Sequence, residues 1–578
     1  MKARLAGTPR CGLRSAQPNR GICVAQVSKP AVSPTSKSAA QPCGRRVWKP
    51  ATQQTWKSAL RIDPERAKTA AWRLLLFVCL TLFCSPPTQA HVGSPDIFFN
   101  GLVGPWPARI TIRMPGVVPG RAAILVQVQS KEPVAVTFVP LASGIAVSNA
   151  PPPESAPMAA GETNLYTGEL WLMTSGAYSI DVHIRGKSGE GAVQIPVDSV
   201  ASTQLPLPPM LGQILALLGL LLFCSAIVII AAAAGEGALP PNGSPGKTER
   251  RKYWTAATIT GLVLTLGLVG GKKWWDAEEK DYRSRLVEGG WPDLTADVRV
   301  EGSQRILDLS LSGKSFAFHG PNNILKLEPD HGKLLHLFLV GRDNHQNFCH
   351  IHPVRGGHLS FEVVLPPLPE GDYEMFCDLT LSSGFSSTAT NIVHLPPIPA
   401  VAAATNAVQA DPDDSWAIDP GVAARENAGG DTLCRLPGGT QIIWKAHQGL
   451  RANQDAALQF LVRDQAGQPA KLEPYMGMMS HAAVLRPDGR VFSHLHPSGN
   501  YSMAAQMFFE SKMSKETGLT ASADHSKLDD WCGPPPTGGG ASFISLPYEF
   551  PTPGDYRVWV QIKTDGRVVT GIFDATVM

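Results

Sequence analysis

The sequence predicts a mainly β fold, with three exported Ig-like antiparallel β-sandwich domains and a two-helix transmembrane hairpin. Short apolar stretches separated by turn residues recur along most of the chain, as they do in antiparallel sandwiches. Two long apolar runs interrupt them and account for the hairpin. Gly and Pro number 55 and 50 among 578 residues, a composition that favours strands joined by turns over a helical bundle.

The N-terminal segment predicts a leader rather than a folded domain. Residues 1–65 are polar and basic, so we expect either a disordered leader or a start assigned too early. Residues 66–90 have the pattern of a secretory signal peptide, with basic residues around the start of an apolar core and a small-residue site ending at Ala90. Cleavage there would make His91 the mature N-terminus; an uncleaved signal anchor is the alternative.

The two long apolar runs lie at 211–234 and 254–271, and each is long enough to span a bilayer as a helix. Tryptophans at the ends of the second run are typical of interfacial anchors. Because the signal peptide directs export, we expect the loop at 235–252 to be cytoplasmic and the sandwiches to lie outside the cytoplasm. The lipid bilayer is therefore an expected partner.

The three sandwiches are expected at 91–208, 292–396 and 441–578, with 397–440 as a linker between the last two. These two domains contain the same sequence motif, in which an apolar run that begins with a histidine is followed by a turn and then by His-x-His-Pro. A Gly-Asp-Tyr follows in each and opens a further apolar stretch. The repetition predicts that the two domains are close structural relatives.

The repeat gives each of these domains three histidines, which are His336, His350 and His352 in one and His481, His494 and His496 in the other. Folding the first hairpin symmetrically about its turn places His336 opposite His350. Folding the second places His481 opposite His494. Opposed residues share a face, and the last histidine lies two residues farther along that same face. We therefore predict three converging imidazoles on each hairpin.

Three neutral imidazoles suit Cu(II) or Zn(II). Methionines surround the second set, and strand alternation predicts that Met479 shares a face with His481. Thioether sulfur prefers Cu(I), so copper is the expected metal and zinc the less favoured one. The alternative is that the methionines fill the core and that His-x-His-Pro is only a strand end with hydrogen-bonded rings.

Cysteines in the exported part predict disulfides. Cys349 and Cys377 occur together in one copy of the repeat and are absent from the other, so we expect a bridge between them. Copper ligation by these cysteines is the alternative. Cys434 and Cys532 belong to the last domain alone and are expected to form a second bridge.

The segments at 330–336 and 348–353, with the Gly-Asp-Tyr strand downstream, resemble the YtkA-like and FixH-like exported β-domains of bacteria. That resemblance covers about 320–396 and 470–575 and implies copper handling or assembly of haem-copper oxidases. In the first domain, His91 with Asp181 and His183 is similar to the site of CopC-like copper carriers. This second resemblance implies one more copper site; the alternative is that His183 is an ordinary surface residue.

Several function classes are disfavoured. Lys and Arg total 51 against 48 Asp and Glu, which gives no reason to expect nucleic acid. Neither a carboxylate pair nor a nucleophile triad is found, so no catalytic residues and no enzyme are predicted. The expected protein is anchored in a bacterial inner (plasma) membrane, with most of its mass on the periplasmic or extracellular side. It would sequester copper or deliver it to a copper-dependent oxidase or efflux system. The alternative is a structural or assembly protein without metal.

Overall fold

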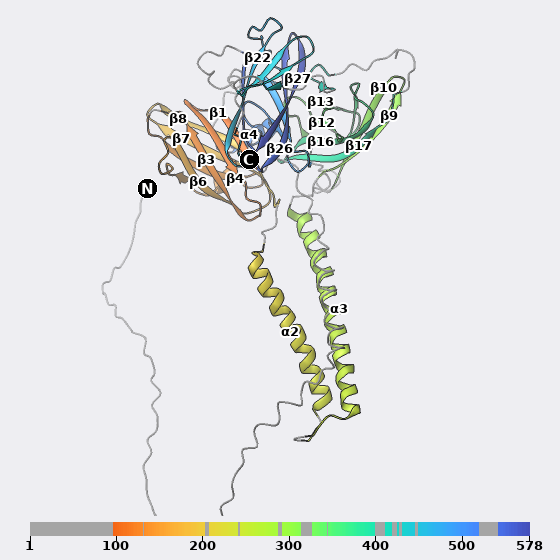
Figure 1. Ribbon diagram of the computed structural model, residues 1–578. Coiled ribbons are helices and arrows are strands. Elements are labelled where there is room, and N and C mark those ends of the chain that lie inside the picture. Colours follow the sequence, from red (N-terminus) through yellow and green to blue (C-terminus); the bar gives the residue numbers. More distant parts are fainter. Residues whose placement is uncertain are drawn as a thin grey trace, which may run out of the picture. The chain divides into compact units, whose positions relative to one another are not determined.

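The computed structural model places most of the chain from residue 96 onward in one compact unit, Thr88–Met578. It describes 96–578 apart from residues 131, 203–206, 238, 241–242, 287–291, 314–325, 344, 399–410, 419–424, 427–429, 446–448 and 519–541. The expected leader, the signal peptide and His91 lie outside the described residues. The described part is mainly β, as the sequence predicts (Figure 1).

The first sandwich has two four-stranded antiparallel sheets. One contains, in order, β1 (Ile97–Val103), β2 (Trp106–Arg113), β3 (Gly120–Val128) and β6 (Leu165–Leu172). The other contains β5 (Glu154–Ala156), β4 (Ala135–Ala142), β7 (Gly176–Gly186) and β8 (Gly189–Ser199), with a short 3-10 helix at Val147–Asn149 before β5. Alternation along β7 buries Ile180, Val182 and Ile184 between the sheets.

The second sandwich supplies the first histidine hairpin. One sheet contains β14 (Val354–Arg355), β15 (Ser360–Val364), β10 (Gln304–Ser312) and β9 (Asp293–Glu301). The other contains β11 (Leu327–Glu328), β16 (Gly371–Leu381), β12 (His336–Gly341), β13 (Phe348–Ile351) and β18 (Ser415–Ala417), with β17 (Ser386–Leu395) on β16. Strand β18 lies within the predicted linker at 397–440, so part of that range belongs to a sheet.

The third sandwich supplies the second histidine hairpin. Its first sheet contains β19 (Arg425–Glu426), β20 (Thr432–Arg435), β21 (Gln441–Trp444), β22 (Asp455–Arg463) and β25 (Phe543–Glu549). Its second contains β24 (Phe492–Leu495), β23 (Ser480–Leu485), β26 (Gly554–Thr564) and β27 (Arg567–Val577). Helix α4 (Met503–Thr517) follows β24. Ser502 caps its first turn, and Gly518 ends it in the left-handed conformation with φ +71°.

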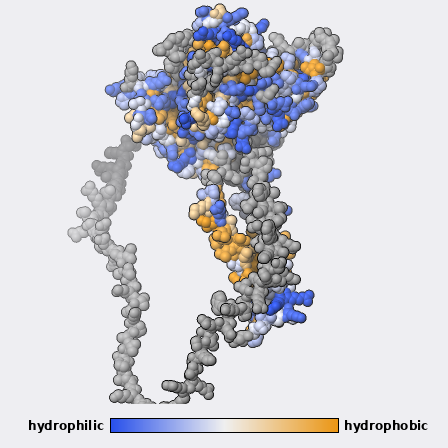
Figure 2. Space-filling model, viewed as in Figure 1, coloured by the Kyte–Doolittle hydropathy of each residue, from blue (hydrophilic) through white to orange (hydrophobic). Residues whose placement is uncertain are grey.

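Two apolar helices follow the first sandwich. They are α2 (Pro209–Glu236) and α3 (Lys247–Leu286), and both are long and apolar enough to cross a membrane (Figure 1). Figure 2 shows the apolar surface of α2. The two helices contact each other closely at Gly235, where a Cβ atom would lie 2.9 Å from the Cβ of Tyr253. This agrees with the predicted two-helix hairpin, although α3 continues well past the predicted end at residue 271.

Two strands that carry histidines, β12 and β23, are buried on both faces. In β12, Leu337 and Leu339 belong to the core of the second sandwich, whereas Phe338 and Val340 belong to a separate apolar layer. In β23, Ala483 and Leu485 belong to that same layer. The outer faces of two sheets therefore pack against each other, and the histidines lie in the same interface.

The layer between the two sheets follows the sequence repeat. Phe376 stacks on Phe492 with ring centroids 4.3 Å apart, and Phe348 stacks on Trp559 at 4.7 Å. Phe376 and Trp559 occupy the same position after Gly-Asp-Tyr in their copies, and Phe348 and Phe492 both precede His-x-His-Pro. The two contacts are therefore equivalent, as in the two-fold interface of a homodimer.

Candidate metal site

Seven histidine rings form one buried cluster between the second and third sandwiches. They are His331, His336, His350, His352, His481, His494 and His496. Contacts cross the domain boundary: the ring centroid of His494 lies 5.4 Å from that of His336 and 5.2 Å from that of His350. The sequence predicts a separate set on each hairpin; the structure joins the two sets into one cluster.

The predicted hairpin registers are wrong by two residues in both copies. His350 lies opposite Phe338 rather than His336, and His494 lies opposite Ala483 rather than His481. Each turn is centred one residue later than expected, which moves the pairing by two. An even shift leaves every side chain on its face. The histidines of each hairpin therefore still point to one side.

His336, His350 and His352 form the first of two three-histidine groups, with ligand atoms within 4.8 Å of one another. His336 Nε2 lies 3.2 Å from the carbonyl oxygen of Asp330, which can only accept a hydrogen bond, so this nitrogen donates. The lone pair of neutral His336 is then on Nδ1, which lies 3.1 Å from His350 Nε2.

The other two rings of this group are held through Nδ1 rather than Nε2. His350 Nδ1 lies 3.0 Å from Oε1 of Gln561, whose own amide nitrogen contacts Ser415 Oγ. His352 Nδ1 lies 2.9 Å from Asp414 Oδ1. With Nδ1 donating in both rings, Nε2 carries the lone pair. Three lone pairs then converge, and oxygens that hold the other nitrogen of each ring and so fix its orientation are typical of metal-bound histidines.

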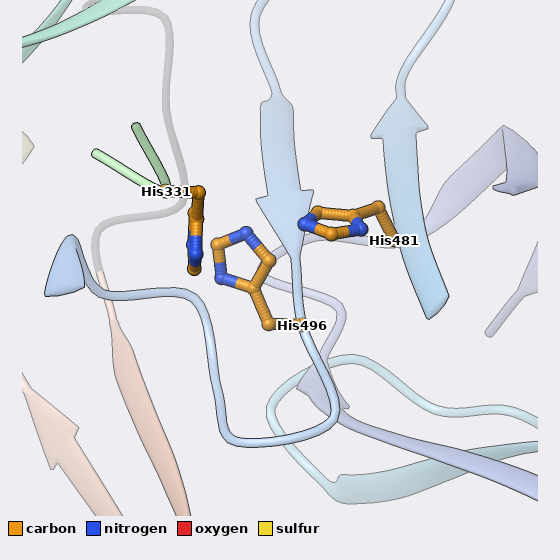
Figure 3. A group of neighbouring side chains, drawn as sticks. All are labelled: His331, His481 and His496. Atoms are coloured by element: carbon orange, nitrogen blue, oxygen red, sulfur yellow. The ribbon is translucent and has the colours of Figure 1, made fainter. Parts of the chain in front are cut away.

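His331, His481 and His496 form the second group, again with ligand atoms within 4.8 Å of one another. In Figure 3 the ring of His496 lies between those of His331 and His481, and its centroid is 4.9 Å from the centroid of each. Neither ring nitrogen of His481 or of His496 has a hydrogen-bond partner among the described residues. Because leaving such buried atoms unsatisfied is costly, these rings are suited to a ligand.

A third group consists of His352, Asp411 and Asp414, whose ligand atoms also lie within 4.8 Å of one another. Lys333 Nζ already lies 2.5 Å from an Asp411 carboxylate oxygen. The ammonium group of Lys333 competes with a metal cation for this carboxylate. The acidic groups around His352 therefore suit a supporting role better than a metal site of their own.

Burial keeps the histidines neutral. It lowers the pKa of His336 to about 4, with a smaller effect from the neighbouring His494 ring. Burial also holds the pKa values of His350, His352, His481 and His496 well below the ordinary 6.5. Neutral imidazole is the form that binds metal ions, so near pH 7 these rings are in a ligating state.

His331 is the member of the cluster that the predicted ligand set misses. It lies in a tight turn in which Asp330 and Lys333 exchange backbone hydrogen bonds, with φ +51° at His331 and Gly332 next. Met476 occupies the equivalent position of the second copy, five residues before His481, with φ +48° and Gly477 next. The common spacing to the following histidine is the signal that could have found His331.

The prediction that strand alternation places Met479 on the same face as His481 does not apply, because Met479 lies outside the strand. Strand β23 begins at Ser480, so strand periodicity does not extend to Met479, which packs against the core of the third sandwich. Met476 and Met478 are buried in the preceding turn, whereas Met507 is exposed. Among these methionines, the repeat points to Met476 rather than Met479.

The predicted Cys349–Cys377 disulfide is wrong. Both are free thiols buried in the core of the second sandwich, on β13 and β16. Strand β12 lies between these strands, and Cys349 and Cys377 pair with different residues of it, so their Cα atoms are separated by more than two strand spacings, about 9.5 Å. A disulfide requires less than about 7 Å. Cys434 is buried in the third core, and its predicted partner Cys532 lies outside the described residues.

The predicted pair in the first sandwich is found together. His183 Nε2 lies 3.0 Å from Asp181 Oδ2 on β7, and this hydrogen bond raises the pKa of His183. Their expected partner His91 lies outside the described residues, so the third component of that site stays a prediction.

A family described as Domain of unknown function (DUF8832) matches residues 437–578, a range that contains strands β21 to β27 and helix α4 of the third sandwich but not β19 and β20. No curated protein matches the chain. Solved structures show only weak overall similarity, and the chain covers less than half the length of those compared below.

Alpha-2-macroglobulin from Salmonella, reacted with methylamine, has 9% identity and a TM-score of 0.16, with 86% of this chain and 24% of that chain covered. Alpha-2-macroglobulin from Escherichia coli, activated by porcine elastase, has 10% identity and a TM-score of 0.16, covering 82% and 43%. Dimeric latent PorU from Porphyromonas gingivalis has 8% identity and a TM-score of 0.12, covering 80% and 32%.

Proposed function

We propose that this chain is a membrane-anchored copper-binding protein that holds copper between two related β-sandwiches outside the cytoplasm. The observation that carries the proposal is the cluster of seven histidines contributed by both copies of the repeat, five of which are buried. Exported sequestration or delivery of copper fits a bacterial membrane anchor formed by α2 and α3. A copper-dependent oxidase or an efflux system would be the recipient in the delivery role.

A bound ion explains features that a purely structural cluster leaves unexplained. His336 Nδ1 and His350 Nε2 approach to 3.1 Å although the other nitrogen of each ring is already held by an oxygen. Two facing lone pairs repel unless a cation lies near both. The unpartnered nitrogens of His481 and His496 support the same conclusion.

Copper is proposed over zinc on ligand chemistry. Imidazole binds both ions, and copper is the stronger binder in the general order of divalent metal affinities. The repeat also places a thioether, Met476, where the other copy has His331, which adds a softer ligand type that suits Cu(I). Since the groups are composed of neutral imidazoles, we propose binding rather than catalysis.

An assembly role without metal is the second candidate. The stacked pairs Phe376–Phe492 and Phe348–Trp559 make an apolar interface that needs no ion. In that case the histidines would only pack between the two sheets.

The deciding experiment is metal analysis of the full chain in detergent after loading with copper or zinc and removal of excess ion. We expect about two copper ions per chain, one for each three-histidine group. The His350→Ala and His496→Ala variants should each lose about one ion. His394→Ala is the matched control, because His394 is exposed and pairs with Asp372 outside the cluster. Wild-type protein without bound metal would favour the assembly role. Tighter retention of zinc than of copper would identify zinc as the bound metal.

A further inference from the structure

A cavity of about 210 Å³ opens beside the histidine cluster. All three sandwiches contribute to its wall: Asp198 comes from the first, Asp378 from the second and His494 from the third. His336 and His496 also line it, so the cavity reaches both three-histidine groups. Its volume is many times the space that one water needs, which leaves room for a hydrated ion.

The wall of this cavity is acidic and rich in hydroxyl groups. Asp198, Asp330 and Asp378 line it, and no Lys or Arg is among the described residues of the wall. Burial raises the pKa of Asp198 well above its ordinary value, so this acid favours its neutral form. Serine and threonine side chains supply further oxygens from both β17 and β24. Carboxylates gathered in a recess with low-dielectric walls raise the local concentration of cations. We call this recess the acidic port.

Asp378 links the acidic port to the cluster. Its Oδ1 accepts a hydrogen bond from Thr388 Oγ1 at 2.6 Å, and its Oδ2 lies 3.4 Å from His494 Nδ1. The remaining nitrogen of His494, Nε2, is buried and has no hydrogen-bond partner among the described residues. Asp378 therefore holds one side of the ring and leaves the other side available.

His494 lies between the two groups but belongs to neither. Its centroid is 5.2 Å from that of His350 in the first group and 4.5 Å from that of His496 in the second. His496 is 4% exposed, lines the port and has both ring nitrogens without a partner, so ligand atoms are present at the inner end.

We propose that the acidic port is the route by which a metal cation reaches the cluster, with His494 as the first ring that it meets. This inference rests on the proposed metal-binding function and adds the path of loading. The carboxylates attract the hydrated cation. His494 then binds it and passes it to the three-histidine groups on either side. Ligand exchange of this kind involves no net redox change.

The test is the rate of copper loading into the metal-free full chain in detergent. Protein is mixed with Cu(II) as its glycine complex, free copper is quenched with EDTA at fixed times, and bound copper is measured after desalting. We expect Asp378→Asn to slow loading about tenfold, because carboxylates in a recess focus cations. Asp198→Asn replaces an acid that burial favours in its neutral form, so it should load at nearly the wild-type rate. The final number of copper ions should not change for Asp198→Asn.

Asp372→Asn is the control, since Asp372 is an exposed acid that pairs with His394 outside the port. The wild-type rate should also fall as salt is raised, whether or not the variants fold. A wild-type rate in Asp378→Asn, or a rate insensitive to salt, would overturn the port while leaving the metal site intact. Failure of wild-type protein to bind copper would instead overturn the proposed function.

Discussion

His352 Nδ1 lies 2.9 Å from Asp414 Oδ1, although 62 residues separate them in the chain. The same carboxylate oxygen also accepts a hydrogen bond from the backbone nitrogen of His352 at 3.0 Å. Both residues are buried, so this contact fixes the ring orientation and directs Nε2 toward His336 and His350. The segment that carries Asp414 therefore supports the first three-histidine group.

Asp414→Asn should lower copper affinity of this group about 10- to 100-fold, as loss of a supporting carboxylate does in other metal sites. An amide at this position no longer favours the Nδ1–H tautomer by its charge. Competition with a chelator of known affinity measures the change. Asp372→Asn, which alters an exposed Asp–His pair of similar length, should leave affinity unchanged. Equal affinities for both variants would contradict the supporting role.

Acid should destabilise the metal-free protein. The folded-state pKa of His336 is about 4, against 6.5 in an unfolded chain, so the unfolded state binds protons more readily. The stability linked to this ring is present above pH 6.5 and is lost as pH falls from 6.5 toward 4, by at most about 3 kcal/mol. The other four strongly buried rings act in the same direction.

Urea denaturation between pH 7.5 and 4.5 measures this dependence. Asp414 acts in the opposite sense, because burial raises its pKa to about 7 and its protonated form is favoured in the fold. We expect the histidines to outweigh it. His336→Gln should therefore flatten the pH profile, and His394→Gln, at an exposed ring outside the cluster, is the control. A profile of unchanged slope in His336→Gln would show that this ring does not titrate as described.

His331 comes from one copy of the repeat and contributes to the second three-histidine group. By the same relationship, the repeat predicts that Met476 of the other copy faces the first three-histidine group. Met476→Leu, which nearly conserves volume, should then weaken Cu(I) binding about tenfold and leave Zn(II) binding unchanged, since thioether favours Cu(I). Competition with a Cu(I)-specific chelator measures this. Met507→Leu is the control because Met507 is 59% exposed. If Met479→Leu rather than Met476→Leu weakens Cu(I) binding, the equivalence between Met476 and His331 is wrong.

The aromatic layer should hold the two sandwiches together. Phe492 is buried and stacks on Phe376 at 4.3 Å, so Phe492→Ala should cost about 3–5 kcal/mol of unfolding free energy. Ile392→Ala, at a position 51% exposed, should cost far less. Denaturant unfolding with and without copper checks both. If the cluster spans the interface, copper should also bind less tightly to Phe492→Ala.

Cys349 and Cys377 should remain free thiols of low reactivity. Burial raises the pKa of both thiols well above the ordinary value, which suppresses the reactive thiolate. A thiol reagent added to folded, unreduced protein should modify neither, and both should react once the chain is denatured. A mass that shows them already linked would contradict the strand order of this sheet.

The repeat determines that the histidines of each hairpin share a face. Alternation along a strand has a period of two, and the true registers differ from the predicted ones by two residues, so the prediction of a common face is unaffected. The continuous apolar runs after His336 and His481 also indicate that both faces of these strands are buried, since a strand with one exposed face has polar residues at alternate positions.

Only the tertiary structure decided that the two faces meet. The stacking of Phe348 on Trp559 and the contact between His336 and His494 depend on two sheets that are far apart in sequence. Asp414 and His331 joined the site from a predicted linker and from a turn, where no strand periodicity marks a buried side chain. Local sequence fixes which way a strand side chain points, whereas the surface it meets is chosen by the packing of the whole chain.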